Sequence, residues 1–300
     1  MPCPIALALR ERVQVCSTMA GLLGCSDGAV SLKHLIKTSR LFVKYRSRYS
    51  NVYHCSVYRT GSQWFRRFLS DPHVVRCSGL LYRMDFRRIF STTEVRDRTV
   101  SNEFPFFKPF RKRMILGLYT SYDSYLKIPK PRKYRAFFVT RDPRDIVVSH
   151  YFASRRDAAH SKNRLYYEQL SQPASGIPWM IDRLDEMGLF AAQRSWAGVS
   201  NDPNVLILHF EDLIGDRQFE SFKKLLRHCD IALPDSVLNR LLRKYSFQML
   251  AGGRPPGEED ENSHYRKGVP GDWKNHFSPA HVDKFKATTG DLVTLIGYDW

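Results

Sequence analysis

Continuous apolar runs, each bounded by charged or turn residues, recur along the chain from residue 51 onward. The clearest of these runs read RAFFVT and NVLILHF. A short apolar run without polar alternation is typical of a strand in a parallel sheet that is buried on both faces. The pattern predicts strands at residues 52–58, 114–119, 135–140 and 204–210.

Segments in which apolar residues recur with helical spacing follow these strands. We expect helices at residues 62–70, 143–153, 178–199, 216–229, 234–248 and 278–290. Alternating strands and helices predict a single α/β domain with a central parallel sheet flanked by helices. Residues 251–278 interrupt the alternation with a long stretch rich in Gly, Pro and charge, which is typical of a functional loop or a disordered one.

The length and charge of the chain narrow the class of protein. With 300 residues, 43% of them apolar, the chain can bury an ordinary globular core. Its net charge of +17 indicates an anionic partner, and nucleic acid, an anionic nucleotide or an acidic membrane surface would each satisfy that charge.

The first 50 residues lack a strong hydrophobic period and end in the basic run KTSRLFVKYRSRYS. We expect residues 1–50 to form an N-terminal basic flanking segment, ahead of a domain at residues 51–300. The basic run is either solvated or a cover over an anionic site.

The cysteines and the hydropathy pattern suggest the compartment. None of the six cysteines forms a Cys-x-x-Cys pair, and Cys55 and Cys77 lie in apolar stretches, where we expect them to be buried as free thiols. Such usage is typical of a reducing compartment. No apolar run is long enough to span a bilayer, and no basic n-region precedes the N-terminal apolar stretch, so we expect a soluble cytoplasmic protein.

The stretch SVYRTGSQWF joins the first predicted strand to the first predicted helix through a tight turn. Backbone N–H groups at a helix start attract anions, and Arg59 adds a permanent positive charge. This P-loop-like strand–turn–helix lacks the Gly-Lys-Ser/Thr of an ATP-binding loop. It is either an anion cradle or a plain turn with polar surface residues; the candidate binding residues are Arg59, Thr60, Gly61, Ser62, Gln63 and Trp64.

Two further segments carry candidate anion ligands. In FFVTRDPRDIVVSHYF, Arg141 follows a predicted strand, Asp142 is a candidate helix N-cap, and Ser149 lies about two helical turns further on. Arg141 and Ser149 are candidates for binding one phosphate; the alternative is a surface ion pair between Arg141 and Asp145. In YRKGVPGDWKNHF, Gly268 would let a phosphate approach the backbone closely, next to two cations.

Together the three segments resemble the sulfotransferases that use 3′-phosphoadenosine 5′-phosphosulfate (PAPS). The family's first motif, Pro-Lys-Ser-Gly-Thr-Thr-Trp, corresponds to residues 58–64. Its second motif pairs an Arg and a Ser, matched by Arg141 and Ser149. Its third motif, Arg-Lys-Gly-x-x-Gly-Asp-Trp-Lys, is matched in full by residues 266–274. The resemblance covers residues 51–300.

The resemblance implies a site for PAPS as the donor, with no metal ion. The turn would hold the 5′-phosphosulfate, and Trp64 and Phe247 would stack on the adenine unless they only pack in the core. The 3′-phosphate would be held by Arg141, Ser149, Arg266, Lys267 and Gly268.

Two positions depart from the family pattern. Arg59 stands where the family has the lysine that stabilises the leaving oxygen, and arginine supplies charge there but no general acid. The family's usual histidine base is replaced by Tyr119, and no histidine lies between residues 74 and 149. Candidate bases are Tyr119 itself, Asp123 acting directly or through a tyrosine, or no base at all; His150 and His276 are further candidates.

The sequence therefore predicts a sulfotransferase that modifies a hydroxyl or amine of a small acceptor, with no nucleic acid as partner. A P-loop nucleotide kinase and a basic nucleic-acid-binding protein are the alternatives, and the three motifs favour neither. We expect residues 80–112 and 153–200 to shape the acceptor pocket. The chain gives no indication of oligomeric state. Aromatic candidates for that pocket are Phe104, Phe106, Phe107, Tyr166, Tyr167 and Trp179.

Overall fold

A computed structural model describes residues 43–89, 113–159 and 170–300, which belong to a compact unit running from Val43 to Trp300. Within these residues the sheet has five strands, all parallel, in the order β2-β3-β1-β4-β5. The strands are β1 Asn51–Ser56, β2 Leu81–Ile89, β3 Met114–Thr120, β4 Tyr134–Thr140 and β5 Val205–His209. The predicted parallel α/β fold is confirmed.

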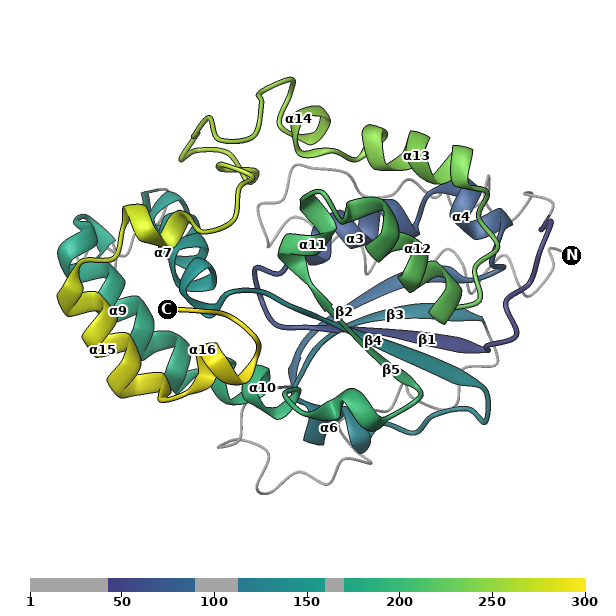
Figure 1. Ribbon diagram of the computed structural model, residues 1–300, viewed down its shortest axis with the longest axis horizontal. Helices are drawn as coiled ribbons and strands as arrows, with labels where there is room; N and C mark the ends of the chain where they lie inside the picture. Colours follow the sequence, from purple (N-terminus) through teal and green to yellow (C-terminus); the bar gives the residue numbers. More distant parts are fainter. Residues whose placement is uncertain (1–42, 90–112, 160–169) are drawn as a thin grey trace, which may run out of the picture. The chain divides into compact units, whose positions relative to one another are not determined.

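Helices cover both faces of this sheet (Figure 1). Those before β5 are α3 Ser62–Leu69, α4 Pro72–Arg76, α6 Tyr122–Leu126, α7 Pro143–Ala159, α9 Pro173–Glu186, α10 Leu189–Ser195 and the 3₁₀ turn η1 Val199–Asn201. Those after β5 are α11 Phe210–Ile214, α12 Gln218–His228, α13 Asp235–Lys244, α14 Phe247–Leu250, η2 Asp272–Asn275, α15 Pro279–Thr289 and α16 Leu292–Leu295.

Every residue of β1 is buried, because this strand lies in the middle of the sheet. Alternate side chains enter different cores: Val52 packs with residues of α3, α12 and α13, whereas Tyr53 and Cys55 pack with residues of α7, α9 and α15. The central strand is thereby held rigidly, and so is the turn that leaves it.

The strand that sequence reasoning missed is β2, which reads LYRMDFRRI. It lies at the edge of the sheet, where charged residues are tolerated, so it lacks the apolar run by which the other strands were recognised. Two predicted helices are also divided in the structure, at Gly188 between α9 and α10 and at Ser246 between α13 and α14.

Residues 43–50, which we had assigned to the flanking segment, are bonded into the folded unit. The backbone N–H of Ser47 donates to the Ser78 carbonyl at 2.9 Å, and that of Ser50 donates to the Lys133 carbonyl at 2.9 Å. Tyr49 is buried. The rest of the predicted segment, residues 1–42, lies outside the described residues.

Two smaller expectations can be compared with the structure. Cys55 is a buried free thiol, as expected, whereas the free thiol of Cys77 is partly exposed. Across residues 43–89, 113–159 and 170–300, no helix combines the length and the apolar character needed to cross a membrane.

Candidate active site

A cavity of about 590 Å³ is lined by residues at or just beyond the carboxyl ends of four strands. Tyr119 lies at the end of β3, Arg59 follows β1, Arg141 follows β4, and Phe210 follows β5. Open α/β sheets bind ligands at this edge, where neighbouring connections diverge to opposite faces. The volume of the cavity lies within the range of small-molecule sites.

The turn between β1 and α3 has a backbone shape that few residues adopt. Arg59 has φ 67° and Gly61 has φ 81°, and a β-carbon on Gly61 would lie 2.7 Å from the Phe210 ring. Thr60 does not line the cavity, because its buried hydroxyl donates to the Val57 carbonyl at 2.9 Å. Its side chain therefore fixes the turn. The other candidates of this segment do line the cavity: Arg59, Gly61, Ser62, Gln63 and Trp64.

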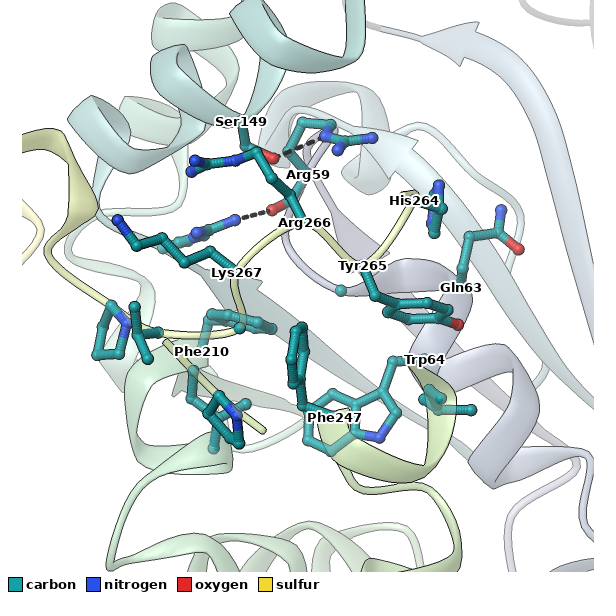
Figure 2. Close-up of a pocket in the computed structure, with 18 of the residues that line it drawn as sticks. Arg59, Gln63, Trp64, Ser149, Phe210, Phe247, His264, Tyr265, Arg266 and Lys267 are labelled. Atoms are coloured by element: carbon teal, nitrogen blue, oxygen red, sulfur yellow. Dashed lines mark hydrogen bonds between the residues drawn. The ribbon is translucent and has the colours of Figure 1, made fainter. Parts of the chain in front are cut away.

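Arg59 connects the first motif to the second (Figure 2). Its Nε donates to the Ser149 hydroxyl at 2.9 Å, and its own carbonyl accepts from Nη1 of Arg141 at 2.9 Å. Burial, and then the charge of Arg141, lower the pKa of Arg59 to about 10. Arg59 therefore remains a cation at neutral pH.

Arg141 is the candidate ligand with unused hydrogen-bonding capacity. Its Nε is buried and has no partner among the described residues, and its guanidinium lies 4.9 Å from the centre of the Phe210 ring. The alternative ion pair with Asp145 is not formed, because Asp145 accepts from the backbone N–H groups of Gly271 at 2.7 Å and Trp273 at 2.9 Å. Asp145 thus ties the third motif to α7.

The second motif also provides the predicted helix cap. The carboxylate of Asp142 accepts from the backbone N–H of Arg144 at 2.9 Å, at the first turn of α7. It also forms a buried ion pair with the Arg144 side chain at 2.7 Å. This cap fixes the start of the helix that carries Ser149.

In Figure 2, Arg59, Arg266 and Lys267 lie on one side of the cavity, and Trp64 and Phe247 lie on the other. A cavity with cations on one side and aromatic rings on the other suits a ligand that has a flat ring at one end and negative charge at the other.

Both aromatic candidates reach the cavity, and one of them is also a core residue. Trp64 is only 8% exposed, packs edge-on against Phe222 at 5.3 Å, and donates from Nε1 to the Tyr245 carbonyl at 2.8 Å. Phe247 is half-buried and packs against Gly268, where a β-carbon would lie 2.2 Å from the ring. Core packing therefore fixes Trp64, while Gly268 fixes Phe247.

The candidate bases lie in very different environments. Tyr119 lines the cavity with its hydroxyl 2.6 Å from that of Ser62, and burial raises the pKa of its phenol above the ordinary value of 10.0. Asp123 is exposed on α6 and is not among the residues that line the cavity. The structure thus brings Tyr119 to the site and leaves Asp123 outside it.

Neither histidine candidate lines the cavity. His276 lies 3.2 Å from the Asp272 carboxylate, within the loop, as its position in the motif suggested. His150 packs edge-on against Tyr58 at 6.0 Å and does not line the cavity. Burial, and then Arg59, lower its pKa to about 3, so it is neutral.

Sequence reasoning missed several residues of the cavity wall. Phe210 follows β5 directly, in the same way that Arg141 follows β4, so its place after a strand was an available signal. His264 and Tyr265 immediately precede the third motif. Tyr245, by contrast, reaches the wall only through the fold, since nothing in its local sequence points there.

One of the six aromatic residues expected in the acceptor pocket lies within the described residues. This residue, Trp179, is partly buried and packs against the main core. The remaining five lie outside the described residues: Phe104, Phe106, Phe107, Tyr166 and Tyr167.

The comparison of the whole sequence with protein families is decisive. The sequence model described as "Sulfotransferase domain" matches residues 51–297. The chain belongs to the sulfotransferase family. The resemblance that rests on the three motifs is thereby confirmed.

Curated relatives of this sulfotransferase are distant in sequence. Mouse "Sulfotransferase 1 family member D1" is 23% identical over 209 residues, 59% of this chain and 67% of the relative. Human "Sulfotransferase 2A1" is 26% identical over 161 residues, covering 51% and 54%. The guinea-pig "3-beta-hydroxysteroid sulfotransferase" is 28% identical over 188 residues, covering 56% and 60%. The chain thus spans about half to two thirds of the length of these relatives.

Solved structures share the fold. Mouse sulfotransferase SULT7A1, complexed with PAP, has a TM-score of 0.57 at 20% identity and covers 84% of this chain and 86% of its own. Retinol dehydratase, in complex with androsterone and the inactive cofactor PAP, has a TM-score of 0.51 at 16% identity, covering 89% and 87%. The likenesses confirm the α/β sulfotransferase fold.

Proposed function

We propose that this protein transfers a sulfuryl group from PAPS to a hydroxyl or amine of a small acceptor. The observation that carries the proposal is the convergence of three separate segments on one cavity. The turn after β1, Arg141 between β4 and α7 together with Ser149 on α7, and residues 266–268 of the loop all line it.

The residues present fit the donor. Arg141 has a buried Nε without a partner among the described residues, and such a charged donor favours an anionic ligand. We assign the 3′-phosphate to Arg141, Ser149, Arg266, Lys267 and the backbone at Gly268. The adenine would lie between Trp64 and Phe247, where the cavity wall is aromatic.

The phosphosulfate would lie on the turn, at the N-terminus of α3. Unpaired N–H groups at a helix start favour negative charge, and Ser62 and Gln63 line the cavity there. Because Gly61 has no side chain, its backbone packs directly against the Phe210 ring at this wall of the cavity.

When bound, PAPS supplies the sulfuryl group, and its S–O bond to the phosphate breaks as the acceptor's bond to sulfur forms. Negative charge then grows on the former bridging oxygen. Arg59 is a cation within the turn. A cation that interacts mainly with the negative charge that develops in the transition state lowers the activation barrier more than it strengthens the binding of PAPS.

The acceptor must also lose a proton, which passes to water where no side chain serves as base. A phenol whose pKa is raised stays protonated at neutral pH, so Tyr119 is suited to donate a hydrogen bond and unsuited to accept a proton. We propose that the Tyr119–Ser62 pair donates one hydrogen bond to the transferred group, since the bond between the two hydroxyls uses the other hydrogen. Asp123 is exposed and is not among the residues that line the cavity, so we do not assign it the role of base.

Ligand-dependent melting tests the donor assignment. Adenosine 3′,5′-bisphosphate (PAP) should raise the melting temperature well above the shift given by adenosine 5′-monophosphate, because the 3′-phosphate forms charge-assisted bonds worth roughly 1.5–3 kcal/mol each. Equal shifts from the two nucleotides would refute the assignment.

Transfer of labelled sulfate from PAPS tests the activity itself. The names of the relatives and structural neighbours make hydroxysteroids and retinol the first acceptors to try, followed by phenols and amines. The cytoplasmic location expected from the cysteine pattern stays a prediction.

A further inference from the structure

Two carboxylates occupy the cations that we assign to the 3′-phosphate. Arg266 donates from Nη1 to Glu259 and from Nη2 to Asp272. Lys267 Nζ lies 2.6 Å from an Asp272 oxygen and 3.7 Å from a Glu259 oxygen. Phe152 covers one face of the Arg266 guanidinium, with its ring centre 4.3 Å from the central carbon. A phosphate that approaches Nη1 of Arg266 and Nζ of Lys267 from the side that Glu259 occupies therefore competes with this carboxylate for them.

The two carboxylates differ in how firmly they are held. Asp272 has a side chain only 3% exposed and also accepts from the Asn275 amide at 2.8 Å, and these bonds hold its pKa far below the ordinary value against the cost of burial. Glu259 is 29% exposed and has no partner among the described residues other than Arg266 and Lys267. Glu259 is thus the carboxylate that a phosphate can displace.

The backbone of the loop places Glu259 beside these cations. The N–H of Gly257 donates to the Lys267 carbonyl at 2.8 Å, and that of Asp260 donates to the Arg266 carbonyl at 2.9 Å. The Arg254 guanidinium donates to carbonyls on both sides of this fold, at Glu258 and at Arg266. The chain is thereby reversed so that its acidic run lies against its basic motif.

We propose that Glu259 is a built-in substitute for the donor's 3′-phosphate, and that nucleotide binding displaces it from Arg266 and Lys267. This inference rests on the proposed function. Without a nucleotide, Glu259 reduces the repulsion among the cations around the cavity. A nucleotide that carries a 3′-phosphate must displace Glu259, so Glu259 weakens the binding of such nucleotides and leaves those without a 3′-phosphate unaffected.

The substitution Glu259→Gln tests this competition, because it removes the charge and keeps the shape. By calorimetry, PAP should bind the variant about three- to tenfold more tightly, the range expected from removing a partly exposed ion pair that binding must break. The melting temperature without ligand should fall or stay level, and the increase caused by PAP should grow.

Glu258→Gln is the matched control. It removes one charge from the neighbouring position, whose exposed side chain forms no ion pair among the described residues. It should change PAP affinity by less than about twofold, since the interaction of an exposed charge is screened by salt. Affinity for adenosine 5′-monophosphate should be the same in both variants, because that nucleotide has no phosphate to place on Arg266.

The outcomes separate this inference from the proposed function. Unchanged or weaker PAP binding by Glu259→Gln, in a protein whose wild type binds PAP, would overturn the inference alone and make Glu259 an orienting partner of Arg266. An increase in PAP affinity that is the same in Glu259→Gln and Glu258→Gln would also overturn the inference. Failure of the wild type to bind PAP would overturn the proposed function, and the inference with it.

Discussion

Replacing Gly268 by alanine should weaken nucleotide binding, because it would displace the Phe247 ring. A β-carbon at Gly268 would lie 2.2 Å, 2.4 Å and 2.5 Å from three carbon atoms of the Phe247 ring. Real carbon atoms do not approach so closely, so the ring must move. Because Phe247 is one of the two aromatic residues assigned to the adenine, its displacement should open the stacking site.

The size of the effect follows from two separate contributions. Gly268 has φ 72°, a left-handed backbone that costs a residue with a β-carbon roughly 1–2 kcal/mol. That strain lowers the stability of the fold. The loss of a base-stacking partner costs roughly 1–3 kcal/mol of binding, which corresponds to a PAP affinity about 5- to 150-fold weaker.

Gly252→Ala separates the two contributions. Gly252 lies in the same loop with φ 73°, and a β-carbon there would meet nothing within 4 Å. The variant should share the loss of melting temperature and keep the PAP affinity of the wild type. Calorimetric titration with PAP measures the difference, and equal affinities of the two variants would refute the assignment of Phe247 to the adenine.

The remaining predictions concern the reacting end of the site. Arg59→Ala should lower turnover about 10²-fold and change PAP affinity less, measured by steady-state kinetics and by calorimetry. Unchanged turnover would show that Arg59 does not stabilise the leaving oxygen. Tyr119→Phe should lower turnover, leave PAP binding intact and keep the shape of the pH–rate profile between about pH 6 and about pH 9, since the phenol is protonated throughout. Asp123→Asn should leave rate and profile unchanged; loss of the acidic limb would instead identify Asp123 as the base.

The strands of the sheet interior were recognisable because burial on both faces demands continuous apolar residues. Four of the five described strands were predicted on this ground, and only the charged edge strand β2 was missed. The helices were predicted less accurately at their ends, since breaks such as that at Gly188 depend on local backbone shape as well as on hydrophobic period.

The candidate ligands were recognisable because each motif is short and contiguous. Arg59 and Arg141 come shortly after strands β1 and β4, so a parallel sheet brings both cations to its carboxyl edge. The sequence therefore determined the fold class, predicted an anionic ligand and identified 12 of the 26 residues that line the cavity.

Only the tertiary structure decided which of these groups are available. Thr60 is hydrogen-bonded within its own turn, Asp123 lies outside the cavity lining, and burial raises the pKa of Tyr119 further above neutral pH. Glu259 pairs with Arg266 because the loop reverses its direction between them. Such pairings depend on burial and on chain reversals, which side-chain identity and hydrophobic period do not encode; the sequence supplied the charged groups, and the folded chain set which of them neutralise one another.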